Sequence, residues 1–197
     1  MEPYNTLPIY HLRIEEARDF FYHRHDVYCN QKYADTLPYS FHLDLVDKQC
    51  NKFLYLLEFT QDSDFFNIEK CQKLLRIKIG IFGHDSIEDA RMSYNELKEK
   101  YGKLVADIIM RCTEYTGETR DERKPVVFYQ KLITNEEAVF VKLCDIIANT
   151  KFSLLTNSSM FKKYKKEYFA KVKPLLYLNK YKDMFDYLEQ LYSIQND

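Results

Sequence analysis

Glycine and proline are scarce in this chain, which contains 4 Gly and 5 Pro among its 197 residues. These two residues supply most of the tight turns between short strands, so an architecture of many short strands is disfavoured. Hydrophobic residues make up 46% of the chain, enough to build a substantial core, and in long stretches they recur at helical spacing. The sequence therefore predicts an all-α protein in which residues 1–197 form a single compact domain.

The periodic stretches and their interruptions predict where the helices lie. Pro38 is expected to separate the first two helices, because the residue before a proline disfavours helical backbone angles. Near the end of the third expected helix, Gly80 and Gly83 would let another element approach the helix backbone closely. The helices are expected over about residues 14–31, 40–57, 67–82, 104–112, 159–178 and 180–192, with a polar connector at 61–64 and a charged loop at 116–124.

Two further segments have the form of a capping box, in which a hydroxyl and a Glu three residues later satisfy amide donors at the start of a helix. They are Ser93-Tyr94-Asn95-Glu96 and Thr134-Asn135-Glu136-Glu137. Helices are therefore expected to begin at both places.

Charge, hydropathy and cysteine spacing exclude several classes of protein. The net charge of −1 gives no electrostatic basis for a nucleic-acid partner, and the six lysines among residues 162–173 are typical of a solvated helix face. No apolar run reaches about 18 residues, so no membrane span is expected. Residues 1–5 lack the pattern of a signal peptide. The five cysteines contain no Cys-x-x-Cys pair, which favours free buried thiols in a cytoplasmic protein.

The densest group of chemically active side chains is His84, Asp85, Glu88 and Asp89, directly after the apolar run 74–82. Carboxylates are rarely buried unless they are paired or bind a metal. Helical spacing brings the members of this group onto shared faces, and Asp85 continues the apolar stripe by one turn, toward the interior. Two interpretations remain open from this cluster alone. It is either a metal site or a solvated helix end with acidic residues favoured by the following helix dipole.

A second carboxylate interrupts an apolar stripe further along the chain. The stripe has core-facing helical spacing and consists of Ala138, Val141, Asp145 and Ala148. A carboxylate in such a position is costly unless something positive meets it. The partner of Asp145 is either Lys142, one turn earlier, or a divalent cation; Asn149 lies one turn later on the same face.

His42 follows Pro38-Tyr39 amid apolar neighbours, where a single histidine is more often a core residue than a ligand. With His84, Asp85 and Asp145 it forms a set of two imidazoles and two carboxylates. This mixture suits Mn²⁺, Fe or Zn²⁺ better than Ca²⁺ or Mg²⁺, which prefer shells of oxygen alone.

The order of these residues resembles the signature of the HD-domain metal-dependent phosphohydrolases. The finer pattern resembles the alarmone hydrolases, meaning the SpoT/RelA hydrolase domain and its stand-alone small relatives, over about residues 15–170. The matching segments are Gln31-Lys32-x₅-Pro38-Tyr39-x-x-His42, Gly83-His84-Asp85-x-x-Glu88-Asp89 and Lys142-Leu143-x-Asp145-x-x-x-Asn149.

This resemblance implies a compact helical HD-domain fold, one divalent ion (Mn²⁺ foremost, with Fe, Zn or Co as other options) and removal of the 3′-pyrophosphate from (p)ppGpp. It implies that the metal ligands are His42, His84, Asp85 and Asp145. Glu88 and Asp89 would position or activate the attacking water. The implied substrate contacts are Asn149 near the ribose, Tyr39, Lys142 and Tyr168.

The chain departs from the family where substrate recognition is concerned. Tyr33 stands where the family has an arginine that reaches the guanine, and the spacing from His42 to His84 indicates an insertion near residues 58–70. Another nucleotide, such as NADPH or a nucleoside monophosphate, therefore remains an alternative substrate, as does a nucleotide-binding module without turnover. Arg120 and Arg123 in the charged loop are candidates for a phosphate clamp, the alternative being a solvated loop.

Overall fold

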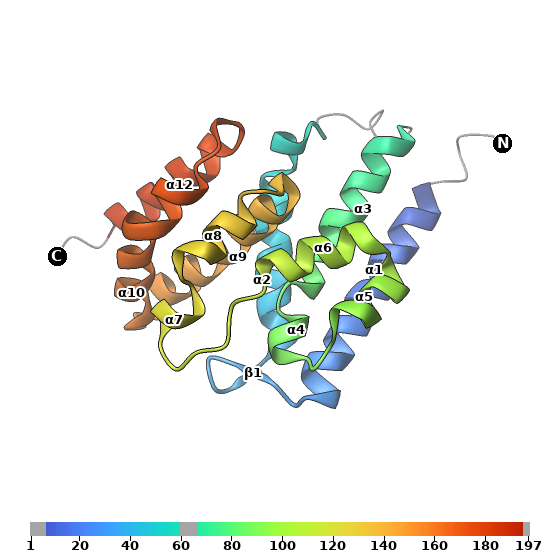
Figure 1. The fold of residues 1–197 in the computed structure, drawn as a ribbon, viewed down its shortest axis with the longest axis horizontal. Helices are drawn as coiled ribbons and strands as arrows, with labels where there is room; N and C mark the ends of the chain where they lie inside the picture. The colour runs from blue at the N-terminus through green and yellow to red at the C-terminus, as the bar shows by residue number, and fades with distance from the viewer. Residues whose placement is uncertain (1–6, 60–66, 195–197) are drawn as a thin grey trace.

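The structure, a computed structural model, describes residues 7–59 and 67–194 and is helical almost throughout (Figure 1). The longer helices are α1 (Leu7–Tyr22), α2 (Tyr39–Lys52), α3 (Ile68–Gly83), α5 (Tyr94–Tyr101), α6 (Lys103–Cys112), α8 (Val126–Leu132), α9 (Glu136–Leu155), α10 (Met160–Glu167) and α12 (Lys182–Ser193). Single turns form α4 (Ser86–Asp89), α7 (Arg120–Arg123) and α11 (Lys173–Leu176). The expected all-α fold is confirmed.

Irregular helical turns and one small hairpin join these helices. Among the described residues, two segments are π-helical, η2 (His23–Tyr28) and η5 (Tyr168–Val172), and two are 3₁₀-helical, η3 (Leu54–Leu57) and η6 (Asn179–Tyr181). The strands β1 (Lys32–Tyr33) and β2 (Leu37–Pro38) pair in antiparallel register.

Helix α9 is the central element of the fold. It packs against α2, α3 and α6 on one side and against α10 and α12 on the other. In Figure 1, α2 and α9 accordingly lie in the middle of the molecule, between the C-terminal helices and the pair α1 and α3. Since α9 is flanked on both sides, most of its residues are buried, and this explains why its apolar pattern is nearly continuous.

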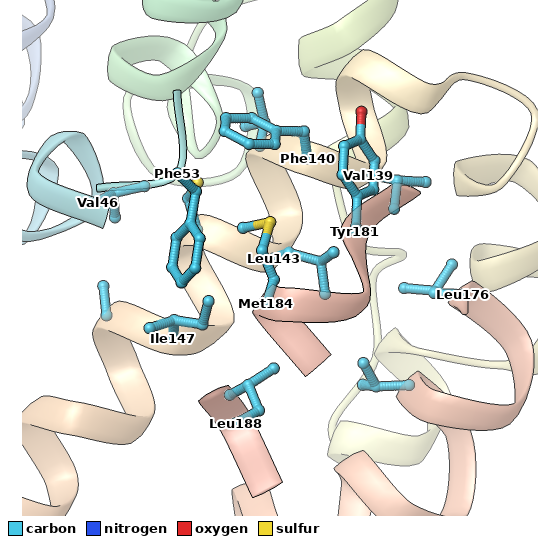
Figure 2. Close-up of a cluster of buried hydrophobic side chains, with 14 of the residues drawn as sticks. Val46, Phe53, Val139, Phe140, Leu143, Ile147, Leu176, Tyr181, Met184 and Leu188 are labelled. Carbon is cyan, nitrogen blue, oxygen red and sulfur yellow. The ribbon is translucent and has the colours of Figure 1, made fainter. Parts of the chain in front are cut away.

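Two hydrophobic cores meet around this arrangement. The larger core joins α9 to the end of α2 and to the C-terminal helices, and Figure 2 shows Leu143 and Ile147 of α9 close to Met184 and Leu188 of α12. The smaller core joins α1, α3, α5 and α6 and includes Phe21 and Ile109. The metal-ligand candidates lie where the ends of α2 and α3 reach the middle of α9.

The helix boundaries differ from expectation in several places. The first helix begins by residue 7 and ends in the π-helical turn η2, and the second ends at Lys52 before the 3₁₀ turn η3. The single helix expected over 159–178 is divided into α10, η5 and α11. The expected connector at 61–64 and most of the expected insertion at 58–70 lie outside the described residues.

One of the two expected capping boxes is confirmed. The Ser93 hydroxyl accepts from the Glu96 amide, and the Glu96 carboxylate accepts from the Ser93 amide. The prediction at Thr134 was wrong, because the Asn135 side chain caps α9 by accepting from the Ala138 amide at 2.9 Å. The Thr134 hydroxyl donates instead to a carbonyl at the end of α8.

The two glycines of α3 permit close approach, as expected. A Cβ atom at Gly80 would lie 2.9 Å from Cγ2 of Ile108, and one at Gly83 would lie 2.7 Å from both Cδ1 of Ile109 and Cζ of Phe21. These distances are too short for carbon atoms in van der Waals contact. Helix α6 and the ring of Phe21 therefore occupy the space that a side chain would need.

Gly83→Ala is expected to lower the free energy of unfolding by about 1–3 kcal/mol, the usual cost of overpacking a core. Phe21 is fully buried and has no room to withdraw. Chemical denaturation measures the change, with Glu99→Ala on the exposed face of α5 as a control expected to stay within about 0.5 kcal/mol of the wild type. A stability equal to the wild type would mean that α3 and α6 are less closely packed.

Candidate metal centre

Four candidate ligands come from three separate parts of the fold. His42 lies in the first turns of α2, His84 and Asp85 form the bend between α3 and α4, and Asp145 lies in the middle of α9. All four are buried, with exposed fractions of 1%, 0%, 9% and 6% in that order. The bend exists because α3 ends at Gly83 and the backbone of Asp85 leaves helical geometry, at φ −102° and ψ 6°.

The ligating atoms face one another across a small space. Nε2 of His84 is 2.9 Å from Oδ2 of Asp85 and 3.7 Å from Oδ1 of Asp145. Nε2 of His42 is 3.3 Å from Oδ1 of Asp145 and 3.7 Å from Oδ2 of Asp85. One ligand atom from each of His42, His84 and Asp85 lies within 4.8 Å of the others. The cluster can therefore hold a metal ion, with Asp145 beside it.

The hydrogen bonding of the His84 ring indicates whether a cation fits between the candidate ligands. Its Nδ1 lies 2.8 Å from the Ile81 carbonyl oxygen, which can only accept, so Nδ1 carries a proton. Nε2 is then the atom turned toward the carboxylates, and within residues 7–59 and 67–194 it has no hydrogen-bond partner despite complete burial. A lone pair facing carboxylate oxygens is unfavourable unless a cation or a proton lies between them. The donor set of two imidazoles and two carboxylates fits a transition-metal ion.

Hydrogen bonds to the carboxylates fix their orientation. The Tyr39 hydroxyl donates to Oδ2 of Asp85. Lys142 lies 2.9 Å from Oδ2 of Asp145, so the ion pair considered from the sequence is present next to the candidate metal centre. Groups of this kind orient the ligands of a metal site and contribute to its affinity.

Asn149, the residue expected near a ribose, is hydrogen-bonded to residues of the candidate metal centre. Its Nδ2 donates to Oδ1 of Asp145, and its Oδ1 accepts from the Tyr33 hydroxyl at 2.9 Å. The ring of Tyr33 stacks on His42, with centroids 4.8 Å apart. Both ends of the Asn149 amide are thus engaged in orienting a candidate ligand.

The centre opens into a cavity of about 160 Å³, and the proposed water-handling pair, Glu88 and Asp89, lies exposed at its mouth. Oε1 of Glu88 accepts from the Glu114 amide at 2.7 Å. Loss of hydration, together with the charge of Asp85, raises the pKa of Glu88 to about 7. The same two causes raise the pKa of Asp89.

Cations from the charged loop form the far wall of this cavity. Lys124 is buried and lies 2.8 Å from Glu114 and 3.3 Å from Glu167. Arg120 also pairs with Glu167, and its guanidinium lies 4.9 Å from the ring centroid of Tyr164. The wall is therefore a network of paired charges in which Lys124 is buried and Arg120 is half-buried, while most of the loop from 116 to 122 is exposed.

Two expected substrate residues lie elsewhere. Arg123 donates to Glu114 from outside the cavity lining, and Tyr168 is buried in the larger core, where its hydroxyl donates to Glu189 at 3.1 Å. Tyr164, one helical turn before Tyr168, lines the cavity instead. The other expected substrate residues, Tyr39, Lys142, Asn149 and Arg120, also line the cavity.

Comparisons by sequence find no matching family model and no matching curated protein. By structure, the chain is similar to a protein described as a metazoan ortholog of SpoT that hydrolyzes ppGpp and plays a role in starvation responses. The TM-score is 0.65, and the match covers 93% of this chain and 96% of the other at 17% sequence identity. The two proteins share a fold.

The shared fold extends over nearly the whole of both chains, a larger share of this chain than residues 15–170, over which the sequence motifs resemble the family. Within the described part of this SpoT-like fold, no helix is long and apolar enough to cross a membrane. The cluster of His42, His84 and Asp85 thus lies in a fold that a ppGpp-hydrolysing protein also has.

Metal binding is expected to release protons from this site. Burial by itself lowers the pKa of His84, but the neighbouring Asp85 and Asp145 outweigh this effect and raise the pKa to about 10. The pKa of His42 is raised by the same two carboxylates against the effect of burial. Below these pKa values the metal-free protein holds the protons that a metal must displace, since only neutral imidazole is a ligand.

Titration calorimetry with Mn²⁺ at pH 7.5, in two buffers of different ionisation enthalpy, should therefore report release of about one proton or more. The affinity should rise with pH up to about 10. Heats that do not depend on the buffer would contradict the protonated state of the metal-free site.

Proposed function

We propose that this chain is a metal-dependent nucleotide phosphohydrolase that removes the 3′-pyrophosphate from (p)ppGpp or a related nucleotide. The observation that carries the proposal is the meeting of three groups at one cavity: four buried metal-ligand candidates, two carboxylates at the mouth and a wall of cations. Three of the ligand candidates, His42, Asp85 and Asp145, line the cavity, and His84 lies directly behind Asp85. The fold shared with a ppGpp-hydrolysing protein supports the same reaction class.

Each group has a chemical task in this reaction. His42, His84, Asp85 and Asp145 would hold one divalent ion, with Mn²⁺ favoured by the mixture of imidazole and carboxylate donors. Such an ion lowers the pKa of water toward about 7 and neutralises charge on a phosphoryl group. Glu88, whose pKa is about 7, is suited to accept the proton of the attacking water near neutral pH. Asp89 beside it would orient that water.

The cationic wall provides a place for the pyrophosphate. Arg120, Lys124 and Lys142 line the cavity, and positioning together with positive charge is most of what phosphoryl transfer requires. The cavity of about 160 Å³ is smaller than the roughly 300 Å³ of pockets that enclose a small ligand. We therefore place only the reacting phosphoryl end inside, with the nucleoside over the mouth next to Tyr33 and Tyr164.

A second candidate substrate is a nucleotide other than an alarmone, such as NADPH or a nucleoside monophosphate. Tyr33 favours it, because a neutral aromatic side chain already engaged with Asn149 replaces the arginine expected to reach guanine. An aromatic ring stacks on any base and does not by itself select guanine.

The test is an assay of the purified chain with Mn²⁺ against a nucleotide panel that includes ppGpp and NADPH. Release of GDP and pyrophosphate from ppGpp, at a higher kcat/KM than any other member, is the expected result. Faster release of phosphate from another nucleotide would support the second candidate. Absence of turnover for every member, with metal bound and nucleotide binding detected, would show a binding module instead.

A further inference from the structure

His25 is a fully buried histidine outside the candidate metal centre. It belongs to η2, the π-helical turn that ends α1, where the Cys29 amide bonds to the carbonyl of Arg24 and the Gln31 amide bonds to that of His25 at 2.9 Å. Its Nε2 is buried and has no hydrogen-bond partner in the described part of the chain. π-Helical turns are rare and frequently occur at functional sites. Both features require an explanation.

The other ring nitrogen contacts Gln31. Nδ1 of His25 lies 2.6 Å from Oε1 of Gln31, an atom that only accepts, so Nδ1 carries the proton and donates it. This contact fixes which end of the Gln31 amide faces the histidine. The amide nitrogen is left to donate to the carboxylate of Asp89. Burial and the charge of Asp85 raise the pKa of Asp89, and the interaction with the Gln31 side chain acts in the opposite direction, as a hydrogen bond to the ionised carboxylate does.

Two more contacts connect η2 to the site. The ring of His25 stacks on Tyr39 with centroids 4.6 Å apart and planes at 15°, and the Tyr39 hydroxyl donates to Asp85. Arg24 donates to the carbonyls of Ala90 at 2.9 Å and of Arg91 at 3.1 Å, directly after α4. The π-helical turn is thus linked to the start of the segment that carries Asp85, Glu88 and Asp89 through Tyr39, and it contacts the end of that segment directly through Arg24.

We propose that His25 is a positioning residue that sets the orientation of the Gln31 amide and, through it, holds the Asp89 carboxylate in position for the attacking water of the proposed reaction. The proposal rests on the phosphohydrolase function stated above. Without the Nδ1 donor, the Gln31 amide is free to turn its oxygen toward Asp89, where two acceptors repel. The carboxylate would then leave its place at the mouth of the cavity.

A matched pair of variants isolates this donor. His25→Leu removes the ring and the donor, whereas His25→Asn, although smaller than histidine, offers Nδ2 at about the position of Nδ1. We expect His25→Leu to lower kcat by about 10- to 100-fold, the usual effect of a misplaced catalytic group. KM and metal content should stay within about twofold of the wild type, because the group acts after binding. His25→Asn should recover most of kcat.

Gln31→Leu provides a second route to the same result, since Gln31 is only half-buried and the variant does not depend on replacing a core residue. Gln31→Leu should lower kcat by as much as His25→Leu does. The double variant should be no slower than either single variant, because the effects of substitutions within one chain of contacts are not additive. Equal losses in His25→Leu and His25→Asn, or additive losses in the double variant, would overturn the proposal.

A measurement that needs no activity separates this proposal from the function on which it rests. In ¹H–¹⁵N spectra of the metal-free protein, the side-chain amide of Gln31 should be protected from solvent exchange in the wild type and in His25→Asn, and unprotected in His25→Leu. An unprotected amide in the wild type would refute the positioning role. If the wild type shows the protected amide but hydrolyses no nucleotide, the function fails and the contact stands. If His25→Leu hydrolyses nucleotide at the wild-type rate, the function stands and the positioning role fails.

Discussion

Asp85→Asn is expected to lower the affinity for Mn²⁺ by more than about 100-fold. Loss of a group that only hydrogen-bonds to a metal ligand already lowers metal affinity by about 10- to 100-fold, and loss of a ligand should cost more. Oδ2 of Asp85 is the atom that faces both His84 and His42, at 2.9 and 3.7 Å. An amide in its place is neutral, so His84 loses its closest anion and His42 loses one of its two neighbouring carboxylates. Nucleotide turnover should fall in parallel with metal content.

Asparagine has the shape of aspartate and keeps an oxygen for the Tyr39 hydroxyl, so the variant should remain folded. Elemental analysis and titration calorimetry measure the metal, and partial recovery of turnover at high Mn²⁺ would confirm that the loss arises from binding. Asp35→Asn is the matched control, because Asp35 is exposed and its φ of 67° suits asparagine equally well. Full metal content in Asp85→Asn would refute the assignment.

The corresponding change at Asp145 is a less clean test of the ligand set. Lys142 is buried and pairs with Asp145 at 2.9 Å, so Asp145→Asn also deprives a buried ammonium of its nearest counter-charge. Removing one partner of a buried ion pair costs about 3 kcal/mol or more. Metal loss in that variant would therefore be accompanied by loss of stability, whereas Asp85→Asn separates the two.

Glu88→Gln is expected to lower kcat by about 10²- to 10⁴-fold, the contribution usual for a general base, while metal content stays that of the wild type. Glu88 is not a ligand candidate, and its hydrogen bond from the Glu114 amide can be kept by the glutamine oxygen. The fold and the metal centre should therefore be unchanged. Metal loss in this variant would assign Glu88 to the ligand set instead.

The pH dependence of kcat gives the same residue a second test. Because the pKa of Glu88 is raised to about 7, its carboxyl is protonated below that pH and cannot accept a proton. The rate should rise as the pH increases through about 7. This rising limb of the pH–rate profile should be missing in Glu88→Gln. Glu99→Gln, on the exposed face of α5, is expected to keep both the rate and the limb. A limb that persists in Glu88→Gln would assign the proton to another group.

The sequence was sufficient wherever the information is local. Apolar periodicity predicted the helices that carry the site, because burying one face of a helix requires that spacing. Asp85 and Asp145 stood out because each carboxylate falls on a stripe that must be buried, and burial of a charge needs a partner. Gly80 and Gly83 predicted close packing against α3, which the structure supplies through α6 and Phe21.

Other features depend on backbone register, which the pattern of residues does not determine. The turn η2 has one more residue per hydrogen-bonded ring than an α-helix, and no residue type marks it, so His25 was not singled out. The second π-helical turn, η5, begins at Tyr168, which lies in the core while Tyr164 of α10 lines the cavity. At the start of α9, Asn135 and Thr134 are both residue types that cap helices well. The N-cap is Asn135, because the backbone enters the helix at that residue.

The sequence by itself determined which side chains must find a partner: the buried histidines and carboxylates of a helical protein. Only the tertiary structure decided which partners they have. Tyr33 and Asn149 are 116 residues apart, and Arg120 and Glu167 are 47 apart, yet each pair is hydrogen-bonded at the site. Local periodicity sets the cost of burial for each residue, but contacts of this kind follow from how distant helices approach one another around α9.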